Sequence, residues 1–143
     1  IVGNGPERAR LEAQAADSGC DVRFLGAVSK EERDAWLALC DVFVMVSQSK
    51  PGDIEGFGMV YLEAAACSKP VVAGKDGGAA EAVDDGRTGL LVDPNNTGAV
   101  AKAISRILLD PSLARGLGEA GKKDFGTKWN WEEMMGRLRK ALV

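Results

Sequence analysis

The residues best suited to chemistry lie between Ile54 and Cys67, where a short loop with two glycines leads into an apolar helical pattern. Only two charges, Glu55 and Glu63, occur in this segment. A carboxylate that is buried without a partner costs several kcal/mol. We therefore expect these two carboxylates to meet a polar partner from outside the chain.

The loop itself is suited to a diphosphate. Gly56 and Gly58 leave the backbone N–H groups of the first helical turn uncovered, and a helix start carries about half a positive charge. A diphosphate can bind there without a lysine. If the segment is helical, Glu55 and Glu63 lie roughly 12 Å apart along it, one on each side of the diphosphate. Each could accept hydrogen bonds from hydroxyl groups, one set on a sugar and the other on a ribose, so the hypothesis is a sugar nucleotide.

A purely structural interpretation fits the same spacing. In it, the two glycines make a tight turn, Glu55 is solvated and Glu63 pairs with a Lys or Arg. A single G-x-G is weak evidence for a phosphate site because it lacks the third glycine of the dinucleotide fingerprint. The spacing alone leaves both interpretations open.

Composition limits the class of protein. With 143 residues the chain can build one hydrophobic core, so we predict a single domain over residues 1–143. The 45% hydrophobic and 27% charged residues argue against disorder. A net charge of -3 without a basic stripe argues against nucleic-acid binding. The chain has no histidine, which excludes a His-based catalyst or His metal ligand within it, and we predict no metal site.

The cysteines and apolar runs bear on location. The three cysteines form no C-x-x-C pair, which favours reduced thiols. No apolar run approaches the roughly 20 residues that span a bilayer, and no signal-peptide pattern opens the chain. We predict a cytoplasmic protein without a transmembrane segment.

Strand-like and helix-like segments alternate along most of the chain. Strands are expected at residues 1–3, 22–25, 42–46, 70–73 and 89–92, with helices at 7–18, 30–39, 57–67 and 79–84 between them. This alternation predicts an α/β fold with a doubly wound parallel sheet. The run at 42–46 is apolar throughout, which is typical of an interior strand. Residues 95–143 should form a mainly helical C-terminal part.

Three glycine turns follow predicted strands: Gly3-Asn4-Gly5, Gly56-Phe57-Gly58 and Gly77-Gly78. Ligands of doubly wound sheets bind beyond the carboxyl ends of the strands. We therefore expect the three turns to line one edge of the sheet.

Several motifs together carry a family resemblance. Glu55 is followed by seven residues and Glu63, and other matching segments occur in the same order as in the family. These segments are Ile1 to Pro6, Val22 to Gly26, Pro70 to Ala73, Gly77-Gly78 with Glu81, and Asp85 to Val92. Over essentially its whole length the chain resembles the C-terminal, donor-binding domain of the retaining GT-B glycosyltransferases of the large E-x7-E family, the glycosyl transferases group 1. The resemblance implies a Rossmann-like half of a GT-B fold.

The resemblance also implies residue roles. Glu55 would be the catalytic-site residue that contacts the hydroxyl groups of the donor sugar, and Glu63 would bind the ribose. The other donor-binding residues implied are Gly56, Phe57, Gly58, Met59 and Val60, whose backbone would hold sugar and diphosphate, and Gly3, Gly5 and Val28. Backbone near Val28 would meet the base, although a core valine fits that position equally well. The family transfers a hexosyl group to a glycan, lipid or small-molecule acceptor with retention and without a bound metal.

A long loop from Gln48 to Ile54 precedes the motif and is similar to that of the mannosyltransferases that act on phosphatidylinositol mannosides. GDP-mannose is accordingly the predicted donor substrate, and no cofactor is expected. Two alternatives remain: a sugar-nucleotide epimerase of GT-B architecture, which the Glu spacing and the lack of histidine disfavour, and a non-catalytic nucleotide-binding domain.

Two parts of the family pattern are missing. In the family this domain begins with a further strand and helix, which carry an Arg and a Lys for the diphosphate, and a separate N-terminal domain binds the acceptor. We therefore expect an N-terminally truncated domain with a defect in its sheet between the Ile1 and Val42 strands. Any peripheral membrane contact would come through the missing domain, and this fragment alone should be inactive.

Overall fold

The computed structural model describes residues 1–48 and 56–142. The chain divides into two compact units, Ile1–Trp36 and Leu37–Val143, which we call the N-terminal unit and the sheet unit and describe separately. The predicted single domain over 1–143 stays a prediction.

The N-terminal unit contains α1 (Arg8–Ser18) and the beginning of α2 (Lys30–Leu39). As predicted, α1 ends at Ser18, and its C-cap Gly19 has a left-handed φ of 67°. A capping box begins α2: the Ser29 hydroxyl accepts the Glu32 N–H at 3.1 Å, and the Glu32 carboxylate accepts the Ser29 N–H at 3.2 Å.

The two strands predicted in this unit are wrong. Residues 1–3 and 22–25 form no ladder: Val2 and Gly3 make isolated bridges to Gly26, and Ile1 makes backbone hydrogen bonds to Arg23 and Leu25. A lone pair of strands is marginally stable in water because it needs a third strand or a packed helix. Each segment has one neighbour at most in this unit, so regular strands do not form.

The sheet unit holds three strands, β1 (Phe43–Met45), β2 (Val71–Gly74) and β3 (Gly89–Val92). They pair in parallel in the order β1-β2-β3, with Val72 between Val44 and Leu90. The run at 42–46 was expected to be an interior strand, but β1 is an edge of the sheet that the described residues form. Val44 is correspondingly 36% exposed.

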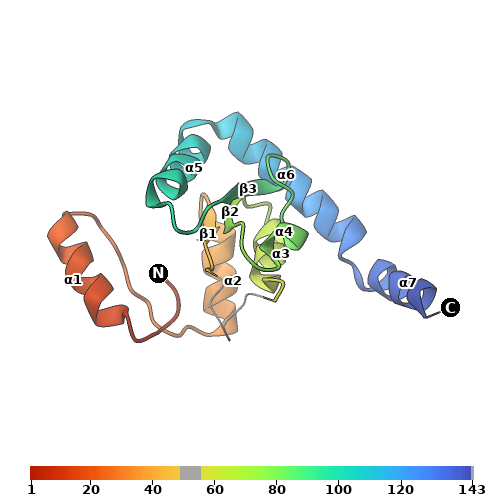
Figure 1. The fold of residues 1–143 in the computed structure, drawn as a ribbon, viewed down its shortest axis with the longest axis horizontal. Helices are drawn as coiled ribbons and strands as arrows, with labels where there is room; N and C mark the ends of the chain where they lie inside the picture. Colours follow the sequence, from red (N-terminus) through yellow and green to blue (C-terminus); the bar gives the residue numbers. More distant parts are fainter. Residues whose placement is uncertain (49–55, 143) are drawn as a thin grey trace. The chain divides into compact units, whose positions relative to one another are not determined.

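Helices cover both faces of this sheet (Figure 1). Val71 and Ala73 pack against Leu37 at the end of α2, α3 (Met59–Ala66) and α4 (Ala79–Ala82). Val72 points to the opposite side and packs with Ala103 and Ile107 of α5 (Thr97–Leu109) and with α6 (Pro111–Lys128). This alternation confirms the predicted α/β fold with a doubly wound parallel sheet.

The C-terminal part consists of α5, α6 and α7 (Trp131–Ala141). Asn96, Asp110 and Asn130 cap these helices, since each side chain accepts the backbone N–H three residues on at 2.8 to 3.0 Å. Within the described ranges 1–48 and 56–142, no helix has the length and apolar character needed to cross a membrane.

Candidate functional site

The glycine loop after β1 leads into α3. Gly58 has a left-handed φ of 75°, a conformation that glycine adopts readily, and α3 therefore begins at Met59 rather than at residue 57 as predicted. The N-cap residue Gly58 has no side chain that could cap this helix start, and the Tyr61 N–H donates to the Gly58 carbonyl at 2.9 Å. The binding of an external acceptor by the backbone at the beginning of α3 stays a prediction.

Tyr61 fixes the first turn of α3 to the sheet. Its side chain is only 1% exposed, and its hydroxyl donates a hydrogen bond to the Met45 carbonyl at 2.9 Å. Its ring also meets the Phe43 ring edge-on, with centroids 6.1 Å apart. Both partners belong to β1, so the strand and the helix start are held together.

The loops after β1 and β2 touch each other. A Cβ atom on Gly78 would overlap the carbonyl oxygen of Gly56 and lie 2.8 Å from the Cα of Phe57. At the end of β2, a Cβ on Gly74 would lie 2.7 Å from the Ser47 carbonyl oxygen. Glycine is thus required for close backbone approach at both points, and two of the three predicted glycine turns do share one edge of the sheet.

Glu63 lies one turn into α3, four residues after Met59 and therefore about 6 Å along the helix axis. The residue is half-buried, and its Oε2 atom is buried. Because α3 begins later than predicted, Glu63 is closer to the helix start than the sequence suggested. The predicted contact of its carboxylate with a ligand on the first turn stays a prediction.

The other predicted site residues fall outside the described part of the sheet unit. Glu55 lies outside the described residues. Gly3, Gly5 and Val28 belong to the N-terminal unit, where the glycines are exposed and Val28 is half-buried. Their roles toward the glycine loop stay predictions.

Sequence reasoning missed the part that α6 plays. This helix lies beside α3 and antiparallel to it (Figure 1). A Cβ on Gly118 would overlap the Ser68 carbonyl oxygen, and a Cβ on Gly121 would lie 3.3 Å from that of Ala65. Residues later in α6 therefore contact residues earlier in the chain, closer to the start of α3. The two glycines three residues apart were the sequence signal for this close helix pair.

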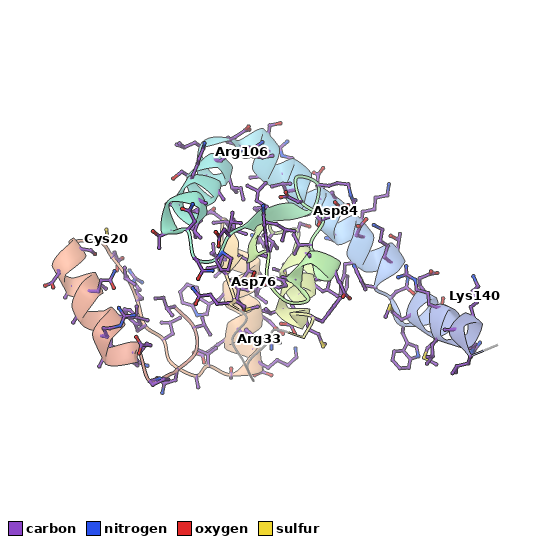
Figure 2. The ribbon with its side chains drawn as sticks, viewed as in Figure 1. Cys20, Arg33, Asp76, Asp84, Arg106 and Lys140 are labelled. Atoms are coloured by element: carbon purple, nitrogen blue, oxygen red, sulfur yellow. The ribbon has the colours of Figure 1, made fainter. Side chains whose placement is uncertain are left out.

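An ion-pair cluster connects α6 to the turn before β3, where Figure 2 labels Asp84. Arg87 pairs with Asp84 at 2.6 Å and also with Asp124, and Lys128 pairs with Asp124 at 2.7 Å. The Asp124 carboxylate is 14% exposed, and the Arg87 guanidinium holds its pKa at about 2. Sequence analysis did not single out this cluster, because its members are far apart in the chain.

A cavity of about 310 Å³ borders the same cluster. Its walls come from α4, from the turn before β3 and from the end of α6, including Glu81 and Trp129. It therefore lies on the α6 side of the structure, next to the residues that support α3.

Comparison with known proteins shows which family this chain resembles. The family model "Glycosyl transferases group 1" matches residues 1–124. A GDP-mannose-dependent alpha-(1-6)-phosphatidylinositol monomannoside mannosyltransferase from Mycolicibacterium smegmatis is 41% identical, over 99% of this chain and 38% of its own length. The chain thus spans well under half of that relative.

Solved structures are similar too. HepE from Anabaena, in complex with UDP and glucose, matches with a TM-score of 0.83 and 27% identity over 99% of this chain and 39% of that one. The C-terminal domain of LpcC, a glycosyl transferase group 1 protein from Francisella tularensis, matches with a TM-score of 0.73 and 28% identity over 87% of this chain and 63% of that one. With the family model over most of its length, the chain belongs to the glycosyl transferases group 1 and corresponds to the C-terminal part of a GT-B glycosyltransferase.

Proposed function

We propose that this chain binds the nucleotide-diphosphate sugar donor of a retaining glycosyltransferase that moves a hexosyl group to a glycan, lipid or small-molecule acceptor. The observation that carries the proposal is the contact between Gly56 and Gly78 at the start of α3. It brings two glycine loops and a helix start with a glycine N-cap to one edge of a parallel sheet, where such folds bind nucleotides.

The diphosphate binds at the first turn of α3, where the backbone of Gly56 to Val60 approaches it without obstruction from side chains at the two glycines. Glu63 accepts hydrogen bonds from the ribose, since it lies one turn along α3 with part of its carboxylate buried. Burial favours this role because hydrogen bonds to a carboxylate are stronger where water is excluded.

Glu55 contacts the hydroxyl groups of the transferred sugar. We assign it sugar positioning and electrostatic help rather than nucleophilic attack. Gly3 and Gly5 line the pocket, and backbone near Val28 meets the base. This set of roles rests on the family resemblance.

GDP-mannose is the proposed donor. The Mycolicibacterium relative is named as GDP-mannose-dependent, and its 41% identity extends over nearly the whole chain. The HepE complex contains UDP, so a similar structure binds a uridine nucleotide. The base is read mainly by backbone in our assignment, so side chains do not decide between the two.

Turnover requires an acceptor site, which the resemblance assigns to a separate N-terminal domain. We therefore propose that residues 1–143 bind donor but do not transfer sugar by themselves. The acceptor-binding domain is the proposed partner.

Isothermal titration of GDP, GDP-mannose, UDP and UDP-glucose into the protein tests the proposal, with folding checked by circular dichroism. We expect GDP and GDP-mannose to bind more tightly than the uridine nucleotides. A folded protein that binds none of the four contradicts the proposed function. Recovery of an altered free sugar nucleotide after incubation would instead indicate the epimerase alternative.

A further inference from the structure

Trp129 directly follows α6 and contacts the glycine loop. Its ring meets the Phe57 ring edge-on, with centroids 5.1 Å apart and planes at 63°. On another side, the Arg137 guanidinium of α7 lies 6.0 Å from the Trp129 ring centroid. The tryptophan is half-buried between these two contacts.

Phe57 is the residue of the glycine loop through which a side-chain contact can restrain the loop. Its neighbours Gly56 and Gly58 have no side chains, so Phe57 carries the only side chain of this three-residue turn. Glycine also gives the backbone more freedom than any other residue, and ordering such a turn therefore costs conformational entropy. A contact that fixes Phe57 removes much of that freedom before a ligand arrives.

Trp129 is itself held in place by α6. Gly118 and Gly121 allow this helix to pack closely against the end of α3 and the residues after it. The Arg87–Asp124 ion pair connects the helix to the turn before β3. The Phe57 contact continues this antiparallel series at the opposite end of α3. Helix α6 thus supports α3 along its length, with Trp129 at the loop end.

We propose that Trp129 is a positioning residue for the donor site: it holds Phe57 and so keeps the Gly56-Phe57-Gly58 backbone in the conformation that receives the diphosphate. This inference rests on the proposed function, because it concerns the same site. Trp129 acts through Phe57 and needs no contact with the ligand. Pre-ordering of the loop raises affinity because binding then orders less of the chain.

The test uses three variants. Trp129→Ala removes the contact with Phe57, and Trp129→Phe keeps an aromatic ring there. Trp131→Ala is the matched control, since this tryptophan is two residues away and 78% exposed. Amide hydrogen exchange of peptides covering Gly56 to Ala66 reports loop order, and calorimetric titration of GDP and UDP reports affinity. Thermal midpoints identify any variant that is globally unstable.

For Trp129→Ala we expect faster exchange in the loop and GDP or UDP binding weaker by roughly 2- to 12-fold, the range that corresponds to the measured strength of aromatic pairs. Trp129→Phe should recover most of both properties, and Trp131→Ala should match the wild type. Loop exchange in Trp129→Ala equal to that in Trp131→Ala overturns the proposal.

Faster loop exchange with unchanged affinity would also overturn it, because Trp129 would then be structural only. If the wild type binds neither nucleotide, the proposed function fails together with the donor-site role of Trp129. The exchange data then still show whether Trp129 orders the loop, so the two failures can be distinguished.

Discussion

The two units of this chain differ in what holds them together. Every buried hydrophobic residue of the described structure lies in the sheet unit, including Tyr61 and Val72. In the described N-terminal unit Gly26 alone is buried. Exposed ion pairs such as Arg8–Glu12 connect side chains on the surface of α1. Exposed ion pairs stabilise by about 0 to 1 kcal/mol, whereas buried side chains contribute more.

This contrast divides the candidate site as well. The glycine loop, α3 and Gly78 are fixed by packing within the sheet unit. Gly3, Gly5 and Val28 belong to a unit that packs little around them. In the proposed assignment, the part of the site for diphosphate and ribose is therefore held by side-chain packing, whereas the part in the N-terminal unit depends on backbone bridges.

The largest expected effect compares two valines. Val72 in β2 is fully buried, so Val72→Ala should lower the free energy of unfolding by about 2–3 kcal/mol. Val22 in the N-terminal unit is 40% exposed, and Val22→Ala should change the free energy of unfolding by less than about 0.5 kcal/mol. Urea denaturation of both variants measures this. Equal losses would mean that the two units share one core.

The next comparison concerns two glycines of α6. Gly118→Ala should destabilise the protein by about 2 kcal/mol, because the new Cβ overlaps the Ser68 carbonyl oxygen. Gly116 has open space at its Cβ position, and Gly116→Ala should stabilise by about 0.5–1 kcal/mol through helix propensity. Thermal unfolding distinguishes them, and two stabilised variants would show that α6 does not approach α3 so closely.

A smaller effect is expected at the ion-pair cluster. The pKa of Asp124 is about 2 in the folded protein, below the ordinary value of 3.8, so its ion pairs stabilise the fold above pH 3.8 and this is lost as pH falls toward 2. Asp124→Asn should cost about 1 kcal/mol at pH 7, because Arg87 is partly exposed to solvent.

Urea denaturation at pH 7, 4 and 2.5 measures this difference. The gap between wild type and Asp124→Asn should narrow as the pH falls. Asp17→Asn, at an exposed position of α1, is the control and should show no such gap. A constant gap at all three pH values would assign the loss to packing instead of charge.

The sequence predicted those features that local chemistry determines. The helix at 30–39 and the strand at 70–73 have strong local patterns, and both elements appear as expected. The strand at 22–25 did not form because a strand depends on neighbours that its own residues do not specify. The late start of α3 followed from the left-handed Gly58.

For the site, spacing identified the glycine loops, and the structure brings two of them into contact. The support from α6 was not foreseen because it depends on contacts such as Phe57–Trp129, which join residues far apart in the chain. A helical pattern shows which face is apolar but not which helix it meets. Glu55 lies outside the described residues, so its role rests on the motif alone.

The central claim is that α3 holds the donor with Glu63 on its ribose, and a comparison of two carboxylates tests it most directly. Glu63→Ala and Glu63→Gln are titrated with GDP and GDP-mannose alongside Glu7→Ala, which removes a carboxylate that pairs with Arg10 on the exposed surface of the other unit. We predict that both Glu63 variants bind at least about tenfold more weakly than wild type, the loss expected for a charge-assisted hydrogen bond, and that Glu7→Ala binds normally. Folded Glu63 variants that bind as well as Glu7→Ala would contradict the account.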